Sequence, residues 1–381
     1  MIHNPSRSIR PAALLAIIAA PLIFACVASA QHPTGDPSSL AALEAEVTSP
    51  RLPKITGILL SRNGSLIYEK YFGEGSRTKL NDTRSVTKTL TALVVGRAIR
   101  DGAIPGIDTK IMPYFGDLKP IANDDPSKED IRLKDLLSMG SALSADDSDG
   151  DSPGNEDRLH EQRSWSRWAV DLPVRMDTAR DGSGYESFHY ATVNAFLVGQ
   201  VLQAATRQPV DGYIAETLLK PLGIEHFAFE RSPIGEVMTG GGLELRGVDL
   251  WKIGQLVLDR GSYEGRLIIP ASWVDACLTL RHTDTEGPGV GYGFYFWHMD
   301  FPVGDKSESG WFMAGNGGNI VVIFPRLKAV AVVTRTDFNG RNTAGQTIGL
   351  LSKFILPVLE GTPETIPQRR MASSKADFAT P

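Results

Sequence analysis

Two serines in this chain are each followed three residues later by a lysine, a spacing that can pair a nucleophile with a base: Ser76 with Lys79, and Ser85 with Lys88. Residues i and i+3 share one face of a helix, and a helix N-terminus favours developing negative charge. Burial lowers the pKa of a lysine because it disfavours the charged form, so a buried lysine can accept a proton near neutral pH. Ser76 lies in the polar stretch GEGSRTKLND, which predicts a surface loop. Ser85 precedes a long apolar run and is the candidate nucleophile, although this spacing alone also fits a capping serine followed by a solvated lysine.

A tyrosine is the candidate third member of the site. Tyr185 and Tyr190 both lie in GYESFHYATVNAFLVGQVL, just before or at the start of an apolar helical run. A phenol beside an ammonium can lose its proton near neutral pH, and it can then take the serine proton or return one to a leaving group. Most tyrosines are only packed with a hydrogen-bonded tip, and the spacing does not choose between these two.

A glycine-rich segment before a β-rich run is the third candidate element. Gly315, Asn316, Gly317 and Gly318 precede Asn319 and the run NIVVIFP. Glycines there let a substrate approach the backbone, and a strand-edge N–H can serve as an oxyanion donor beside the amide of the nucleophile. A simple turn from loop to strand explains the same residues equally well.

The elements that must position these residues come from both ends of the chain. Residues 55–60 and 66–72 flank Asn63-Gly64 and predict a β-hairpin. Residues 89–100 have apolar positions at helical spacing and predict a buried helix, which Gly102 ends. Near the C-terminus, NIVVIFP and KAVAVVTRTD predict two strands, and TIGLLSKFILPVL predicts a helix.

Between these β-rich ends the pattern changes to helices and long polar loops. We therefore predict an α+β fold, in which both chain ends build an antiparallel sheet flanked by helices and an all-α lobe is inserted. Residues 38–107 and 235–360 form the discontinuous α/β domain, and residues 108–234 form the helical lobe. A crevice between the two is the expected ligand site.

Composition and the chain ends bear on partners and location. A net charge of −5 over 381 residues, without a long basic block, gives no footprint for nucleic acid and favours a small substrate. Residues 1–30 have the pattern of a signal peptide cleaved after Ala30, so export and no stable membrane span are expected. A lipoprotein anchored through Cys26 is the alternative. Cleavage would leave Cys277 as the only thiol, and the polar residues 361–381 are expected to be disordered.

The acidic stretch ADDSDGDSPGNED invites a calcium interpretation, with Asp147, Asp149, Gly150 and Glu156 at EF-hand-like offsets. Ala145 stands where the first carboxylate is needed, so a solvated, mobile flap near the cleft is predicted instead. His189, His282 and His298 have no metal-ligand spacing, and TGGGLELRG lacks the strand-to-helix setting of a dinucleotide loop. No metal or cofactor is expected.

In this order, the three candidate elements resemble the serine β-lactamase-like family, which includes class C β-lactamases, D-alanyl-D-alanine carboxypeptidases, family VIII carboxylesterases and aminohexanoate-dimer hydrolases. Supporting stretches include NGSLIYEKYFG, IRLKDLLSMGSAL, KPLGI and AGNGGNIVVIFP. The resemblance implies that Ser85 is acylated with the help of Lys88 and that the Ser85 and Asn316 amides form the oxyanion hole. Because Phe188-His189 also fits the family pattern, it favours Tyr190 over Tyr185.

Two departures from the family pattern bear on the substrate. The third motif usually carries a cation in members that process penicillins, and here it reads Ala314-Gly315-Asn316-Gly317-Gly318. The second motif has Thr192 where an asparagine is usual. Thr192 and the glycines at 315, 317 and 318 are the expected substrate-binding residues. The departures favour an esterase or small-amide hydrolase acting on a small-molecule ester or amide. A D,D-carboxypeptidase, a β-lactamase and a non-catalytic peptidoglycan-binding protein are the alternatives.

Overall fold

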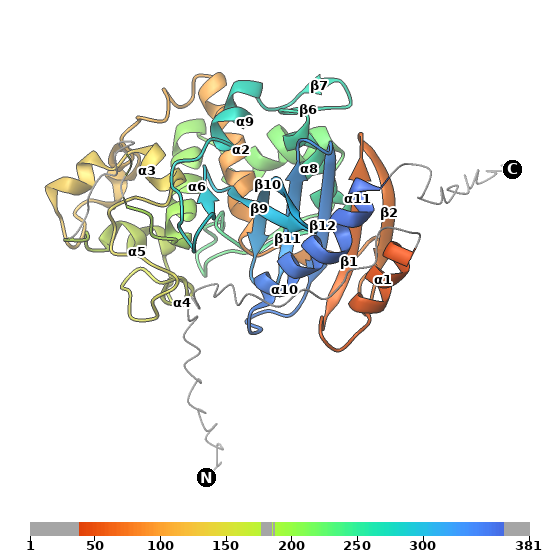
Figure 1. Ribbon diagram of the computed structural model, residues 1–381. Coiled ribbons are helices and arrows are strands. Elements are labelled where there is room, and N and C mark those ends of the chain that lie inside the picture. The colour runs from red at the N-terminus through yellow and green to blue at the C-terminus, as the bar shows by residue number, and fades with distance from the viewer. Residues whose placement is uncertain (1–37, 177–184, 186, 362–381) are drawn as a thin grey trace, which may run out of the picture.

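An antiparallel sheet of seven strands, in the order β2-β1-β12-β11-β10-β9-β8, forms the centre of the computed structural model, which describes residues 38–176, 185 and 187–361. The sheet joins the first strands of the chain to the last, because β1 pairs with β12 (Figure 1). The predicted α+β class and the use of both chain ends are therefore confirmed. The strands are β1 (Ile55–Arg62), β2 (Ser65–Tyr71), β8 (Gly291–Tyr292), β9 (Trp297–Val303), β10 (Lys306–Gly315), β11 (Asn319–Phe324) and β12 (Ala329–Arg335).

The predicted hairpin and the two predicted C-terminal strands are present. Asn63 and Gly64 form the turn between β1 and β2 with φ of 50° and 76°, the left-handed values that a tight hairpin turn requires. Every residue of β11 and β12 is buried, so these strands are covered on both faces. Their continuous apolar sequences follow from this, since an exposed face would favour alternation with polar residues.

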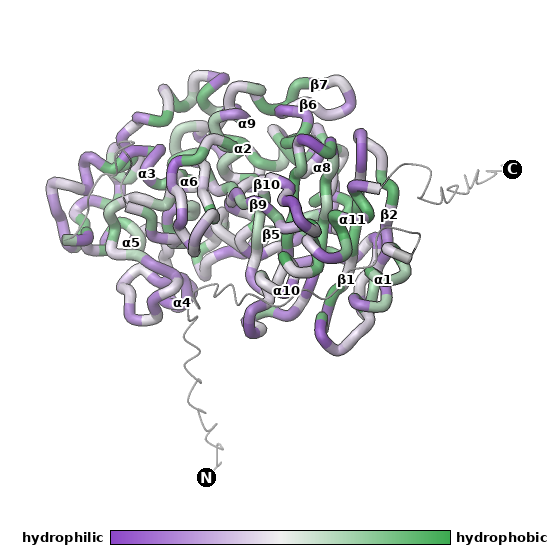
Figure 2. Tube along the Cα trace, in the orientation of Figure 1, coloured by the Kyte–Doolittle hydropathy of each residue, from purple (hydrophilic) through white to green (hydrophobic). Residues whose placement is uncertain are grey.

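Helices cover both faces of the sheet. On one face a core forms with α1 and the C-terminal helices, and on the other α2 and α8 pack against β1, β10, β11 and β12. The hydropathy trace concentrates hydrophobic segments in this interior and hydrophilic ones in the outer loops (Figure 2). The helices outside the lobe are α1 (Ser38–Val47), α2 (Val86–Arg100), α8 (Gly247–Leu258), α9 (Ala271–Cys277), α10 (Thr343–Leu350) and α11 (Leu356–Glu360), with a π-helical turn, Leu351–Ile355, between the last two.

The predicted helical lobe contains mainly short helices: α3 (Leu133–Leu137), α4 (Glu156–His160), α5 (Trp165–Asp171), α6 (Thr192–Thr206), α7 (Val210–Ile214), the 3-10 helices Met112–Leu118, Pro126–Asp130 and Lys220–Leu222, and the π-helical turn Ala215–Leu219. It is not purely helical. Strand β4 (Ala228–Phe229) pairs with β5 (Leu243–Leu245), which also pairs with β3 (Asn81–Asp82). This small sheet connects the end of the lobe to the segment before α2. Strands β6 (Ser262–Tyr263) and β7 (Arg266–Leu267) form a separate hairpin.

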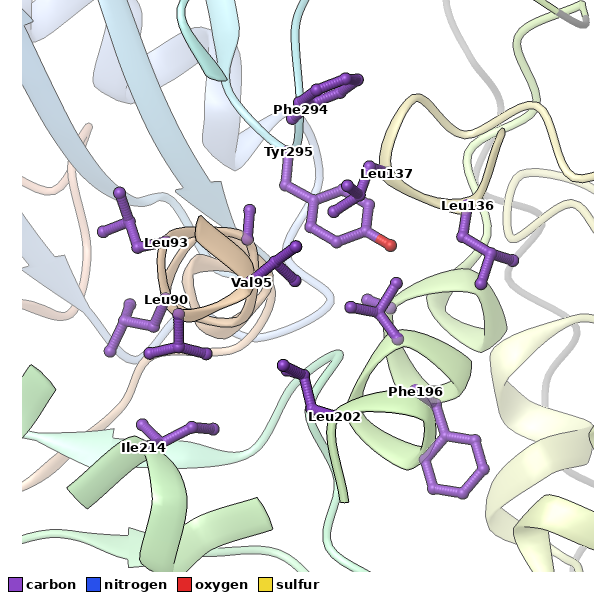
Figure 3. Packing of buried hydrophobic residues seen from close by; sticks show 14 of the residues in the cluster. Leu90, Leu93, Val95, Leu136, Leu137, Phe196, Leu202, Ile214, Phe294 and Tyr295 are labelled. Atoms are coloured by element: carbon purple, nitrogen blue, oxygen red, sulfur yellow. The ribbon is translucent and has the colours of Figure 1, made fainter. Parts of the chain in front are cut away.

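Helix α2 is the central helix of the molecule. It starts at Val86, three residues before the predicted start, and most of its residues are buried on all sides. Figure 3 shows side chains of α2, including Leu90, Leu93 and Val95, packed among residues of the lobe and of the loop before β9. A helix buried on all faces is fixed by its neighbours, so its N-terminus is a rigid place for a reactive residue.

The packing of α2 against α9 requires a glycine at position 96, and we expect Gly96→Ala to destabilise the protein. A Cβ at this position would lie 2.1 Å from the ring of Trp273, whose Nε1–H donates to the Ala92 carbonyl at 2.9 Å. Overpacking of this kind costs about 1–3 kcal/mol of unfolding free energy, which urea denaturation measures. Gly106→Ala is the matched control, because a Cβ there meets nothing within 4 Å. Equal stability of the two variants would contradict the prediction.

The predictions for the chain ends concern residues 1–30 and 361–381, which, apart from Gly361, lie outside the described residues. Cys277 is fully buried, and burial raises the pKa of its thiol, as expected of a small packed side chain. Within residues 38–176 and 187–361, no helix has both the length and the apolar character that crossing a membrane requires.

Candidate active site

Ser85 is the residue immediately before α2 and occupies its N-cap position, with φ of −67° and without a capping hydrogen bond from its side chain. The residue before it, Arg84, has φ of 51°, a left-handed conformation that is uncommon for a side chain of this size. Its N–H donates to the Asp82 carboxylate at 2.9 Å, which helps to hold the turn. A strained residue next to a candidate nucleophile is typical of functional sites, where the surrounding structure maintains it.

Lys88 lies one turn further along α2 and is buried, with 1% of its surface exposed. Its Nζ contacts Ser85 Oγ at 2.8 Å, Thr192 Oγ1 at 2.9 Å and the Gly240 carbonyl at 2.6 Å. Burial lowers the pKa of Lys88, and the nearby carboxylates of Glu156 and Asp147 oppose this effect. The structure thus brings the predicted Ser85–Lys88 pair together and places the amine where burial disfavours its charged form.

Tyr190 lies beside this pair. Its ring centroid is 5.1 Å from Lys88 Nζ, and the ring stacks on Trp297 at 5.5 Å with an interplanar angle of 23°. Burial raises the pKa of the Tyr190 phenol, a hydrogen bond with Ser85 lowers it in part, and the neighbouring carboxylates raise it further. The expected phenolate is therefore not favoured here. The neutral phenol, which can donate a proton, is favoured instead.

Tyr185, the competing tyrosine, lies elsewhere. Its ring meets the rings of His282 at 6.2 Å and Phe294 at 6.5 Å, and the Arg281 guanidinium lies 5.3 Å from its centroid. These contacts place Tyr185 in the packing around α9 and β8. Of the two candidates, Tyr190 is the one in contact with the Ser85–Lys88 pair.

The glycine-rich segment forms the turn between β10 and β11, where Gly315 pairs with Asn319. Gly317 and Gly318 have φ of 86° and 88°, conformations that favour glycine. The Asn316 side chain is held by Asn339 through two hydrogen bonds of 2.7 and 2.8 Å. Oxyanion donation by the Ser85 and Asn316 amides, and substrate binding by the three glycines, stay predictions.

The turn lies against the backbone that precedes the candidate nucleophile. A Cβ on Gly315 would be 2.3 Å from the Thr83 carbonyl oxygen and 3.1 Å from Arg84 Cβ. Only glycine permits so close an approach at position 315. The end of β10 therefore lies against the two residues that precede Ser85.

Two carboxylates from the acidic stretch complete the cluster, and the sequence pattern had indicated them only for a calcium site, not for this one. Glu156 Oε2 accepts the Thr192 hydroxyl proton at 2.8 Å. Asp147 accepts the backbone N–H groups of Thr192 at 2.6 Å and of Glu156 at 3.0 Å. Burial and the charge of Glu156 raise the pKa of Asp147 to about 7, while Lys88 opposes the shift. The Thr192 hydroxyl, predicted to bind substrate, is engaged by Lys88 and Glu156, and its contact with substrate stays a prediction.

The prediction that the acidic stretch is a solvated flap is wrong for the part that faces the site. Residues 148–151 are exposed, but Asp147 and Glu156 face inward and Asn155 is buried. The Asn155 amide donates to the carbonyl of Asp147 at 3.2 Å and to that of Asp149 at 3.1 Å, which folds the segment back on itself. Nothing in the pattern of acidic residues distinguishes the inward-facing carboxylates from the solvated ones.

The histidines and the second Ser-x-x-Lys pair lie in ordinary surroundings. Ser76 and Lys79 form an exposed turn, with the Lys79 N–H 3.2 Å from Ser76 Oγ. His189 contacts Asp146 at 3.4 Å, and His298 contacts Ser309 at 2.9 Å. In the part of the chain that the structure describes, no three His, Cys, Asp or Glu side chains are grouped so that they can hold a metal ion.

The sheet built from both chain ends, the helical lobe, and the Ser-x-x-Lys pair at the start of the buried helix define a fold of the β-lactamase and transpeptidase type. The family model described as Beta-lactamase matches residues 56–350, and the chain belongs to this family. Its members are serine hydrolases.

Individual relatives differ in how much of their length this chain covers. Protein flp of Staphylococcus aureus (strain MRSA252) is 27% identical over 201 residues, 50% of this chain and 38% of that protein, so the match spans well under half of that relative. The 6-aminohexanoate-dimer hydrolase of Paenarthrobacter ureafaciens is 23% identical over 74% of this chain and 70% of the relative. Among solved structures, EstCE1, a hydrolase with promiscuous acyltransferase activity, has a TM-score of 0.62 and 15% identity, covering 83% of this chain and 99% of its own.

Proposed function

We propose that this chain is an exported serine hydrolase that cleaves an ester or a small amide through an acyl-enzyme on Ser85. The observation that carries this proposal is the buried amine of Lys88, 2.8 Å from Ser85 Oγ. Burial disfavours the charged form of Lys88 and lowers its pKa, which favours the neutral amine that can accept the serine proton. Export rests on the signal-peptide pattern of residues 1–30 alone.

The residues suggest a sequence of proton transfers. Ser85 Oγ attacks the substrate carbonyl carbon while its proton passes to Lys88 Nζ, and the tetrahedral oxyanion faces the amides of Ser85 and Asn316. The bond to the leaving group then breaks, and the Tyr190 phenol gives that group a proton and recovers one from the Lys88 ammonium. Water repeats the attack on the acyl-Ser85 ester and releases the acid.

The substrate class follows from what the turn after β10 lacks. The third family motif has no cation here, because residues 314–318 read AGNGG. The guanidinium of Arg84, next to the nucleophile, lies 4.2 Å from the Phe338 ring centroid and 2.9 Å from the Asp82 carboxylate, so it is already engaged. A substrate carboxylate of the penicillin type would lack its usual partner. The names of two similar proteins, a 6-aminohexanoate-dimer hydrolase and the hydrolase EstCE1, also favour amide or ester cleavage.

Intact-mass spectrometry after a fluorophosphonate probe tests this function. We expect one adduct on the wild type, none on Ser85→Ala, and an unchanged adduct on Ser76→Ala, the matched control from the exposed Ser-x-x-Lys pair. If the wild type is not labelled but still binds a muropeptide, the protein is a non-catalytic peptidoglycan-binding protein and not a hydrolase. Turnover of p-nitrophenyl esters alongside nitrocefin then separates the branches, since rapid nitrocefin turnover would favour a β-lactamase or D,D-peptidase.

A further inference from the structure

The three contacts of Lys88 Nζ are not equivalent. The Gly240 carbonyl oxygen, at 2.6 Å, can only accept a proton. The segment that carries it is fixed to α2, because the Thr91 hydroxyl donates to the neighbouring Thr239 carbonyl at 2.8 Å. One N–H of the amine is therefore always committed to this carbonyl.

The second contact is fixed by a carboxylate. A threonine hydroxyl has a single proton, and that of Thr192 is donated to Glu156 Oε2 at 2.8 Å. The Thr192 oxygen is then left with lone pairs for Lys88 Nζ, 2.9 Å away. Glu156 thus makes Thr192 an obligatory acceptor and commits a second N–H of the amine.

The third direction faces Ser85 Oγ at 2.8 Å. A neutral amine has two N–H groups and one lone pair. Since Gly240 and Thr192 take both N–H groups, the lone pair is directed at the serine hydroxyl. The protonated amine places its third N–H in the same direction, so the proton taken from Ser85 is held where it was received.

Asp147 holds the two parts of this chain of contacts together. Its Oδ2 accepts the N–H of Thr192, and its Oδ1 accepts the N–H of Glu156. The carboxylate therefore connects the start of α6 to the start of α4 and sets the separation of the two side chains. Its own N–H donates to the Tyr190 carbonyl at 2.8 Å, which connects the same loop to the third residue of the site.

We infer that Glu156 and Thr192 are positioning residues that hold Lys88 in the orientation of a base toward Ser85. The inference rests on the proposed function, because it assigns a task within that site. No atom of Glu156 enters the reaction: the proton moves from Ser85 Oγ to Lys88 Nζ and then to Tyr190, which gives its own proton to the leaving group. Glu156 accepts the hydrogen bond from the Thr192 hydroxyl, and its negative charge stabilises the Lys88 ammonium that forms.

The charged and titratable groups that face Glu156 come from two helices and two loop segments. Lys88 lies on α2, Asp147 on the loop before α4, and Tyr190 just before α6. His160 and Asp157 belong to the same short helix as Glu156. The pKa of His160 is raised mainly by its hydrogen bond with Glu230, and the charge of Glu156 adds to this effect. Neutralising Glu156 removes the largest charge that opposes the lowered pKa of Lys88, so the lysine will lose its proton at lower pH.

Four variants separate orientation from charge: Thr192→Val, Thr192→Ser, Glu156→Gln and, as a matched control on the exposed side of α4, Asp157→Asn. The readouts are kcat/KM for p-nitrophenyl acetate against pH, and thermal unfolding of each variant. We expect Thr192→Val to lower kcat/KM about 10- to 100-fold and Thr192→Ser to restore most of it, because serine keeps the hydroxyl. Glu156→Gln should shift the acidic limb of the profile to lower pH, and Asp157→Asn should match the wild type.

The outcomes distinguish this inference from the proposed function. A wild type that takes no fluorophosphonate adduct contradicts the function itself. A labelled wild type overturns the inference alone if folded Thr192→Val reacts as fast as wild type, or if Glu156→Gln lowers activity equally at every pH. If Thr192→Val fails to fold, Thr192→Ser and Glu156→Gln still test the inference. A fully active Thr192→Ser variant together with an unshifted pH profile of Glu156→Gln would contradict a role of Glu156 that acts through Thr192.

Discussion

Lys88→Met is expected to lower kcat/KM for ester hydrolysis by roughly 10³-fold, because Ser85 loses the only amine within hydrogen-bond distance among the described residues. Methionine has a similar length and fills the buried site without a basic atom. Pre-steady-state release of p-nitrophenol measures the acylation step directly. Lys79→Met, in the exposed Ser-x-x-Lys pair, is the matched control and should behave as wild type. A Lys88→Met enzyme within tenfold of wild type would remove the lysine from the mechanism.

The same variant must remain folded for this result to count. Methionine leaves the Gly240 carbonyl without its donor, which costs about 1–3 kcal/mol, and it also removes a buried amine whose charge is disfavoured. These effects oppose each other, so we expect only a small change in the free energy of unfolding. Urea denaturation of Lys88→Met beside wild type gives the comparison, and a large fall would attribute lost activity to unfolding.

Tyr190→Phe is expected to lower kcat by about 10²- to 10⁴-fold, with the size set by the leaving group. Phenylalanine keeps the ring that stacks on Trp297 and removes only the hydroxyl. Because burial keeps the phenol neutral, its main task is to protonate the departing oxygen or nitrogen. Amides and alkyl esters need that proton, whereas p-nitrophenolate leaves without it, so the loss should be larger for the first two.

Tyr185→Phe is the control for this measurement, since Tyr185 packs near α9 and β8 away from Ser85. For Tyr190→Phe, the loss of rate should be largest on an amide, smaller on an alkyl ester and smallest on a p-nitrophenyl ester. For Tyr185→Phe, the rates on all three should equal those of the wild type. An equal loss on all three substrates would instead assign Tyr190 to proton removal from Ser85.

The sequence was sufficient for the fold and for two members of the site. Apolar runs at the two chain ends predicted strands, and the Asn63-Gly64 turn has the left-handed geometry that its residue types indicate. Ser85 and Lys88 were found because helical spacing is a local rule, and a serine before a buried helix satisfies it. Choosing Tyr190 over Tyr185 needed the family resemblance, and the contacts of both rings agree with it.

The remaining members of the cluster depend on long-range packing. Glu156 and Asp147 lie in a stretch whose composition indicates solvation, and the folding of that stretch around Asn155 turns two carboxylates inward. Gly240 contributes a backbone carbonyl, and the type of a residue does not reveal such a role. The raised pKa of Tyr190 follows from burial beside carboxylates, so it could not be read from a tyrosine and a lysine alone.

The pairing of β1 with β12 also determines when during synthesis the central sheet can be completed. Thr56 and Thr334 are hydrogen-bonded at 2.8 Å although they are 278 positions apart in the chain. A ribosome therefore completes Ser85, Lys88 and Tyr190 long before it supplies the neighbour of β1, and until then an apolar strand edge is open to wrong partners. Contacts so distant in sequence also make folding slow. A nascent chain stopped before residue 329 would contain all three of these residues but lack β12, the strand that joins the β1–β2 hairpin to the rest of the sheet.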